Sequence, residues 1–210
     1  MSSLAKNPVG RPRGFDEAKV LDAAMQVFWR NGYEGTSMSD LLKATGLHKG
    51  SLYQAFGDKH SLFITALKRY IDNVKAEMGG VLLGADTAIQ GMRAAMRKAV
   101  TMTTTEDGAC NGCMILNSMV EKGQHDPELM QVLENAFKTR MNMITQAIKA
   151  CQQEGSIRKD WAAERITSMI ETMEAGLAAT LKGPVSVEQA YAVIDDTLAI
   201  LKPVEAEVAA

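Results

Sequence analysis

The sequence has few cysteines, prolines and aromatic residues, and it contains no long apolar run. Its three cysteines cannot all pair, which excludes a disulfide-stabilised scaffold. Only five of the 210 residues are proline, which excludes a collagen-like chain. No apolar stretch approaches the roughly 18–20 residues that a membrane span needs, so no membrane partner is expected. The composition that remains, 46% hydrophobic and 23% charged, is that of a folded globular chain.

The first residues do not resemble an export signal. Residues 1–14 are polar and include Lys6, Arg11 and Arg13, without the apolar stretch of a signal peptide. We therefore expect a cytoplasmic protein with a flexible arm over residues 1–14 and a short tail over 203–210.

Charge, aromatic residues and methionine are distributed unevenly along the chain. Residues 1–70 hold ten Lys and Arg against six Asp and Glu, whereas residues 71–210 hold thirteen against nineteen. Eight of the eleven aromatic residues lie before residue 71, and eleven of the fourteen methionines follow it. We predict a small basic domain over 15–75 and a larger, acidic, methionine-rich domain over 76–202. The positive charge favours an anionic partner for the first domain, although a merely solvated surface is the alternative.

Apolar residues recur at helical spacing from Asp16 onward, and no segment alternates as a strand would. Capping residues and glycines divide the first part into helices at about 16–32, 37–46 and 48–56, followed by a long helix that begins at Asp58. The second part is predicted to be helical at about 86–103, 111–122, 127–154, 162–181 and 187–201. The expected fold class is therefore all-α, with about nine helices in total.

The stretch from Thr36 to Phe63 has the spacing of a helix-turn-helix. Two short helices meet at a turn that contains Gly46, and a capped helix follows at once. In this motif the second short helix can lie in the major groove of DNA. Its predicted outward face carries donors for phosphates and base edges: His48, Lys49, Ser51, Tyr53 and Gln54.

Further residues of this stretch fall at characteristic positions: Gly32-Tyr33, Thr36-Ser37-Met38, Ala44, Gly46-Leu47, Lys49-Gly50, Leu52-Tyr53, Phe56, Lys59 and Leu62. Over about residues 14–75 the chain thereby resembles the N-terminal DNA-binding domain of the tetracycline-repressor (TetR) family. The resemblance implies a homodimeric transcriptional regulator, usually a repressor, that binds double-stranded operator DNA and responds to a small-molecule effector. Its larger helical domain would bind the effector and form the dimer.

The resemblance also implies individual DNA contacts. Thr36 or Ser37, at the start of the second helix, should hold a phosphate. Lys49 and Tyr53 should contact the backbone or bases, and Lys59 should meet a phosphate at the start of the fourth helix.

Three residues of the third helix need separate comment. His48 stands where the family often has a small hydroxyl residue, and Ala55 where it often has histidine. Gly50 costs its helix about 1 kcal/mol relative to alanine. A close approach of the helix to the DNA backbone and local packing are both open explanations for that glycine.

The methionine-rich part shows no arrangement of catalytic residues, and we expect no enzyme, no cofactor and no metal site. Methionines at helical spacing are either core filling or the wall of an adaptable apolar pocket. Under the second interpretation the effector site is expected to include Met92, Met96, Cys113, Asn117, Met141, Trp161 and Met173.

Cys110 and Cys113 form a C-x-x-C pair, which lacks the βαβ context of a thiol oxidoreductase and the second pair of a zinc site. Such an oxidoreductase is an alternative from another functional class. The stretch Gly112-Cys113-x-x-x-Asn117 resembles one in family members that sense electrophiles or oxidants. Cys113 is therefore a core cysteine, a pocket residue or the thiol of a redox-sensing repressor.

The last two predicted helices each carry an apolar stripe. The two stripes comprise Ile166, Met169, Ile170, Met173, Gly176 and Leu177, and Ala190, Ile194, Thr197, Leu198 and Leu201. Paired across a twofold axis they would form a four-helix dimer interface; otherwise they belong to the core. The function predicted overall is a dimeric repressor that leaves a palindromic operator when an apolar effector tilts the long fourth helix.

Overall fold

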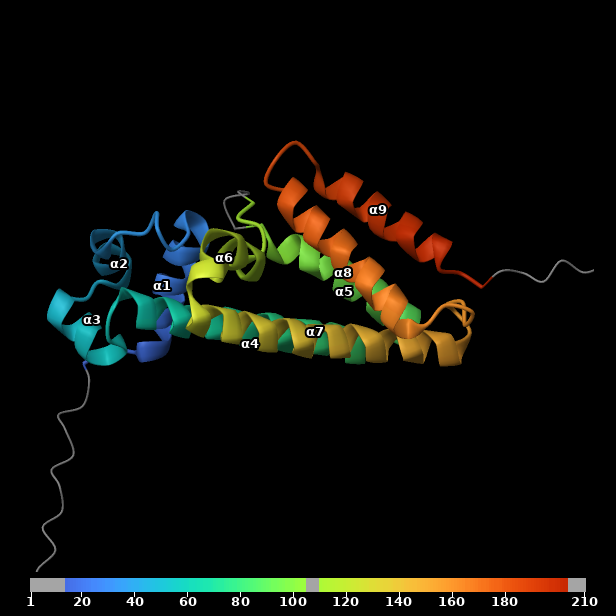
Figure 1. Ribbon diagram of the computed structural model, residues 1–210, viewed down its shortest axis with the longest axis horizontal. Coiled ribbons are helices and arrows are strands. Elements are labelled where there is room, and N and C mark those ends of the chain that lie inside the picture. The colour runs from blue at the N-terminus through green and yellow to red at the C-terminus, as the bar shows by residue number, and fades with distance from the viewer. Residues whose placement is uncertain (1–13, 105–109, 204–210) are drawn as a thin grey trace, which may run out of the picture.

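The computed structural model describes residues 14–104 and 110–203 as an elongated, all-helical molecule (Figure 1). Most of the predicted arm and tail, residues 1–13 and 204–210, lie outside the described residues. The predicted all-α class and helix order are confirmed, with helix ends within a few residues of those expected. The elements are α1 (Glu17–Asn31), α2 (Met38–Thr45), α3 (Lys49–Phe56), α4 (Lys59–Leu83), α5 (Ala88–Met102), α6 (Met114–Lys122), the 3₁₀ turn η1 (Gly123–His125), α7 (Pro127–Glu154), α8 (Ala163–Thr180) and α9 (Val187–Ile200).

Local capping explains where α1, α2 and α4 begin and where α2 ends. The Asp16 carboxylate accepts hydrogen bonds from the first turn of α1, and Asp58 accepts one at the start of α4. Ser37 and Asp40 form a reciprocal capping box on α2. Gly46 ends α2 at a φ of 67°, a left-handed conformation that glycine adopts without steric cost.

The N-terminal helices pack around an aromatic core. Phe28 of α1 and Phe63 of α4 lie edge to face, with ring centroids 5.1 Å apart. Leu41 of α2 and Leu52 of α3 are buried against them. Burial of each such side chain is worth about 1.5–3 kcal/mol. Leu41 and Leu52 are the buried residues of α2 and α3, and each stabilises the packing of its helix against the core.

The long helix α4 joins the two parts of the molecule. It continues without a break past residue 75, where the predicted first domain ends, to Leu83. α4 and α7 run side by side along the molecule (Figure 1). The core around α1–α3 also takes in Met114 of α6 and Leu129 and Leu133 of α7. The N-terminal helices are therefore packed directly onto the larger part.

A second hydrophobic core lies among α5, α7, α8 and α9, and it corrects the predicted dimer interface. Ile166, Ile170, Ile194 and Leu198 from the two apolar stripes are buried in this core of the single chain. They are therefore not available to a second chain, because the apolar stripe of each helix is already buried against the core of its own chain.

Candidate nucleic-acid interface and regulatory cavity

The helix α3 lies at one end of the molecule (Figure 1). Leu52 is only 2% exposed and anchors the helix, whereas His48, Lys49, Tyr53 and Gln54 are exposed. Ser51, also a predicted contact residue, is half-buried. The Lys49 ammonium lies 5.6 Å from the centroid of the Tyr53 ring, so the two side chains occupy one surface patch. This arrangement can reach phosphates and base edges of a major groove.

The structure changes the role expected for Thr36. Its side chain is 1% exposed, and its hydroxyl donates a 2.6 Å hydrogen bond to the Gly32 carbonyl at the end of α1. A hydroxyl committed to an unpaired helix-end carbonyl cannot also hold a phosphate, so Thr36 is removed from the predicted contacts. Ser37 is exposed, but its hydroxyl donates to the Asp40 carboxylate at 2.6 Å.

Lys59 lies at the start of α4, as predicted, with its ammonium over an aromatic ring. The nitrogen is 4.3 Å from the centroid of Tyr33, and the Lys122 ammonium is 4.8 Å from the same centroid. The Lys122 ammonium is also paired with the carboxylates of Glu34 and Asp126, at 3.8 and 4.0 Å. The phosphate contact of Lys59 remains a prediction.

Packing within the chain does not explain why residue 50 of α3 is a glycine. A methyl group added at this position meets no atom of the described residues within 4 Å. Local packing therefore does not explain the glycine, and the close approach of another molecule to the backbone remains as its explanation.

We expect Gly50→Ala to stabilise the fold by up to about 1 kcal/mol while weakening DNA binding at least about 10-fold. The added methyl favours the helix, but it stands where a DNA backbone would approach. Thermal unfolding and fluorescence anisotropy with an operator duplex measure the two effects. Gly80→Ala, an exposed α4 substitution that also meets no atom within 4 Å, is the matched control. An unchanged operator affinity in Gly50→Ala would contradict this explanation.

A second connection between the two parts of the molecule runs through α6 and was not predicted from the sequence. The Glu121 carboxylate accepts hydrogen bonds from the backbone N–H groups of Tyr33 and Glu34, each at 2.9 Å. The Trp29 indole donates to the Gly112 carbonyl, just before α6, at 2.7 Å. Both ends of α6 are therefore hydrogen-bonded to α1 or to the turn that follows it. No local sequence signal identifies such contacts, because the partners are more than 80 residues apart.

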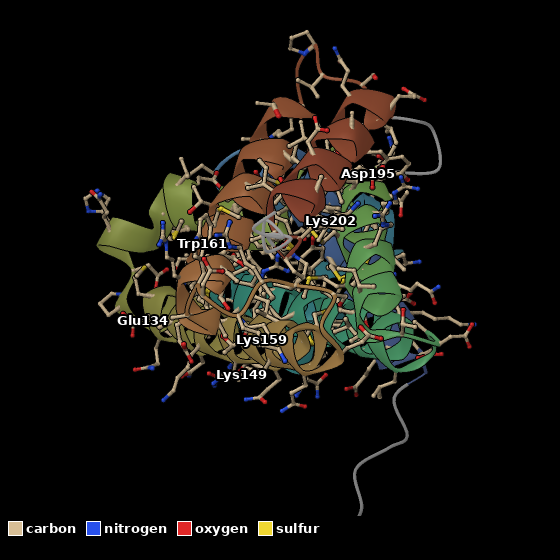
Figure 2. The ribbon with its side chains drawn as sticks, turned by 90° about the vertical axis from the view of Figure 1, so that its right-hand side faces the viewer. Glu134, Lys149, Lys159, Trp161, Asp195 and Lys202 are labelled. Carbon is tan, nitrogen blue, oxygen red and sulfur yellow. The ribbon has the colours of Figure 1, made fainter. Side chains whose placement is uncertain are left out.

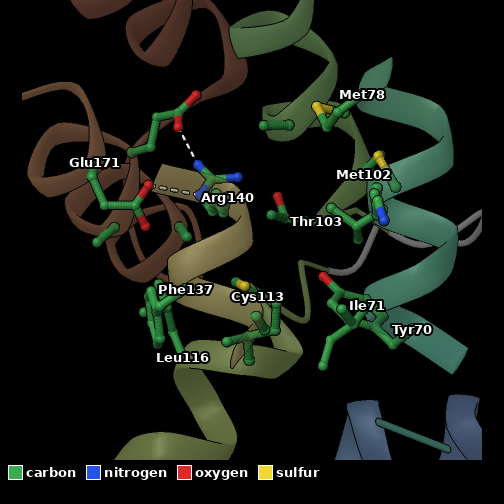
Figure 3. A pocket seen from close by; sticks show the side chains of 18 of the residues that line it. Tyr70, Ile71, Met78, Met102, Thr103, Cys113, Leu116, Phe137, Arg140 and Glu171 are labelled. Carbon is green, nitrogen blue, oxygen red and sulfur yellow. Dashed lines mark hydrogen bonds and ion pairs between the residues drawn. The ribbon is translucent and has the colours of Figure 1, made fainter. Parts of the chain in front are cut away.

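A cavity of about 450 Å³ lies between α4, α5, α6, α7 and α8. This volume is within the range of small-molecule binding sites. Its wall is mostly apolar and includes Tyr70 and Met78 of α4 and Met96 of α5 (Figure 3). Met96 and Cys113 are the two predicted effector residues that line it. Met92 lines a smaller neighbouring cavity of about 40 Å³.

The other four predicted effector residues do not line this cavity, and the expected site is corrected accordingly. Asn117 instead donates to the Asn111 carbonyl at 2.8 Å. Trp161 lies at the end of the molecule far from α3 (Figure 2), with the Arg165 guanidinium 4.1 Å from its ring centroid. Met141 and Met173 are half-buried outside the lining. Helical spacing identifies a face of each helix, but it does not fix which part of that face meets the cavity.

The polar wall of the cavity is a cluster that sequence analysis missed. Arg140 of α7 donates from Nε to Glu171 of α8 at 2.7 Å, and from Nη2 to Glu174 of the same helix. Figure 3 shows the ion pair with Glu171 on the cavity wall. Burial raises the pKa of Glu174 to about 7, while the neighbouring Arg140 charge acts in the opposite direction.

The three cysteines lie in different environments and none is in a disulfide. Cys113 faces the cavity near Tyr70 (Figure 3), whose pKa is raised by burial and, secondarily, by that cysteine. The Cys110 thiol lies 3.6 Å from the Thr103 hydroxyl. Cys151 is buried in the second core, where burial raises the pKa of its thiol to about 11. Within residues 14–104 and 110–203, no three His, Cys, Asp or Glu side chains are placed to share a metal ion.

Comparisons with known proteins identify the family. Residues 20–66 match the family described as "Bacterial regulatory proteins, tetR family", and residues 88–191 match the "Tetracyclin repressor-like, C-terminal domain". The chain is 32% identical to the uncharacterized HTH-type transcriptional regulator YezE of Bacillus subtilis, over 71% of this chain and 76% of YezE. It is 26% identical to the HTH-type transcriptional repressor ComR of Escherichia coli, over 94% of each chain. The chain belongs to the tetR family of bacterial transcriptional regulators.

A solved structure supports the same assignment. A cysteine mutant of the TetR-family regulator CifR, complexed with a 26 bp double-strand operator DNA, is 29% identical to this chain. The two folds agree with a TM-score of 0.78 over 91% of this chain and 100% of that one. In the part of the chain that the structure describes, no helix is long and apolar enough to cross a membrane.

Proposed function

We propose that the chain is a dimeric repressor that holds a palindromic operator with α3 and releases it when a small molecule enters the cavity. The observation that carries the proposal is the double connection between the cavity and the N-terminal helices: α4 begins beside α3, and α6 is hydrogen-bonded to α1 and the turn after it. Two relatives support it: ComR is described as a repressor, and CifR is seen on operator DNA. Two α3 helices about 34–36 Å apart would enter successive major grooves. The proposed role is regulatory rather than enzymatic, and it places the protein with its DNA in the cytoplasm.

Through the two connections, a ligand in the cavity can change the positions of the N-terminal helices α1–α3. α4 forms one cavity wall through Tyr70 and Met78 and begins beside α3. The segment entering α6 meets the cavity at Cys113, and the helix ends at the Glu121 contacts with the turn after α1. A ligand that moves either helix shifts the balance between DNA-binding and released states. Full switching requires a differential affinity of about 5.5 kcal/mol between those states.

We expect Glu121→Ala to weaken the response of operator binding to the ligand. The operator affinity of the ligand-free variant should stay within about 3-fold of the wild-type value, because the lost contacts are exposed and each is worth about 1 kcal/mol. The measurement is the ratio of operator affinities without and with an inducing compound, which typically spans about 5–150-fold. Glu134→Ala, which removes an exposed α7 carboxylate, is the control. If Glu121→Ala kept the wild-type ratio, α6 would not transmit the signal.

The dimer is proposed to form through the exposed faces of α8 and α9. Val193 and Ile200 of α9 are 41% and 61% exposed and lie one heptad apart on the same face. Small residues such as Gly176 and Ala179 are exposed on α8 and permit close helix packing.

Charging this face should separate the chains without unfolding them. We expect Val193→Glu combined with Ile200→Glu to sediment as a folded monomer of about half the wild-type mass. Ile194→Glu is the neighbouring control: its side chain is fully buried in the second core, so a carboxylate there should unfold the chain. If the double variant kept a helical circular dichroism spectrum and sedimented with the wild-type mass, the dimer interface would have to lie elsewhere.

A thiol-based sensor is the second candidate, because Cys113 lines the cavity and is half-buried rather than enclosed. Cys113→Ser separates the two mechanisms. Reversible ligand binding predicts that this variant still releases the operator when an inducing compound is added. A variant that keeps its fold and operator affinity but no longer responds to an electrophile would favour the thiol instead.

A further inference from the structure

The polar wall of the cavity holds more acidic than basic groups. Arg140, Glu171 and Glu174 all line the cavity, with side chains that are 23%, 18% and 11% exposed. Arg140 bonds one oxygen, Oε2, of each carboxylate. Among the described residues no hydrogen bond uses Oε1 of either glutamate, and neither atom is among the fully buried ones that lack a partner. Both Oε1 atoms are therefore accessible acceptors beside the cavity.

The charge of this cluster determines which ligands it tolerates. One guanidinium and two carboxylates carry a net charge of −1 when all are ionised. An anionic ligand would add a third negative charge in a poorly solvated site, whereas a cation would bring the cluster to neutrality. The free Nη1 of Arg140 could donate to a ligand oxygen, but it does not offset a third carboxylate.

The other charged lining residues carry a formal net charge of +1, which water screens. Lys68, Asp72 and Lys75 of α4 line the rim, but all three are exposed and screened by water. The α5 wall contributes no charged side chain among its described lining residues. Tyr70 also lines the cavity, with its pKa raised by burial.

We propose that the cavity takes an apolar molecule with one protonated amine, whose ammonium group binds the free oxygens of Glu171 and Glu174. The proposal rests on the regulatory role proposed for the cavity, and it names the chemical class of the effector. The alkyl part would lie along the apolar wall that includes Met78 and Met96, and the ammonium would lie at the acidic cluster. Burial raises the pKa of Glu174, which agrees with this assignment, because a cation at the cluster would stabilise the ionised form of that buried carboxylate.

The test compares three ligands that share one chain and differ in charge: n-octylamine, 1-octanol and octanoate. Each is titrated into the full-length protein at pH 8 by isothermal calorimetry. We expect the amine to bind at least about 10-fold more tightly than the alcohol, and octanoate to bind most weakly. Amine binding should strengthen from pH 6 to pH 8, because Glu174 ionises in this range while the amine stays protonated.

The variant Glu174→Gln tests the assignment to this cluster. It keeps the size of the side chain and an acceptor for Arg140, and thermal unfolding is the measurement that checks its fold. We expect the amine affinity to fall about 10-fold and to lose its pH dependence, with the octanol affinity unchanged. Asp72→Asn removes a carboxylate from the exposed rim and should change the amine affinity less than about 2-fold.

Several results would overturn the proposal: equal affinity for the three ligands, tightest binding of octanoate, no binding of octylamine, or equal losses in Glu174→Gln and Asp72→Asn. Operator release is measured separately by anisotropy. If octylamine binds as expected but leaves the operator complex intact, the ligand class stands and the proposed coupling to DNA fails. If octylamine does not bind while another compound releases the operator, the ligand class is wrong and the regulatory function stands.

Discussion

Arg140→Met is expected to destabilise the protein by about 3–5 kcal/mol, the largest loss among single substitutions considered for the cavity. The substitution removes the cation from Glu171 and Glu174 and leaves two poorly solvated carboxylates without a partner. Denaturant unfolding measures the loss in free energy, and the melting temperature should fall by roughly 10 °C.

Two controls separate charge from packing in this experiment. Adding Glu171→Gln and Glu174→Gln to Arg140→Met should recover most of the stability, because the unpaired charges are then gone. Arg93→Met breaks an exposed pair with Asp195, a residue labelled in Figure 2, and should cost at most about 1 kcal/mol. If Arg140→Met were as stable as Arg93→Met, the carboxylates would not depend on Arg140 for charge compensation.

Replacing Lys49 and Tyr53 together with alanine is expected to lower operator affinity about 100-fold or more. Each side chain is exposed on α3 and each DNA contact is worth about 1–3 kcal/mol, so the losses combine to that size. The fold should be unaffected, because Leu52 rather than these residues anchors the helix. Anisotropy with an operator duplex and circular dichroism measure the two properties.

Lys138→Ala is the matched control, since it removes an exposed lysine from α7 rather than from α3. It should change operator affinity little and in the same proportion for every duplex. A comparable loss in Lys138→Ala and in the double variant would indicate that overall charge, not α3, holds the DNA.

Helices were predictable because their signals are local. Asp16, Ser37 and Asp58 cap the helices that follow them, and Gly46 ends α2 where a left-handed residue is required. The exposed face of α3 followed from the same periodicity, since Leu52 marks the opposite side. Thr36 was misplaced because a hydroxyl near a helix start can serve either as a surface donor or as an internal hydrogen bond.

The cavity was only partly predictable because its walls come from distant segments. Methionine spacing indicated Met96, which lines the cavity, but the polar wall joins Arg140 to Glu171 across 31 residues. Trp161 was expected to form an aromatic wall of the site, whereas it lies at the end of the molecule far from α3. The predicted dimer stripe around Ile194 was misassigned for a related reason: periodicity cannot tell whether an apolar face covers its own core or a second chain.

The measurement that tests the central claim most directly is sequencing of the genomic DNA fragments that the purified protein retains. The account predicts that the wild-type protein retains a small set of fragments sharing an inverted repeat, with half-sites about one helical turn apart or a multiple of it. The variant with alanine at positions 49 and 53 should lose this enrichment. Uniform genomic coverage for the wild-type protein, or the same fragments retained equally by the variant, would contradict the account.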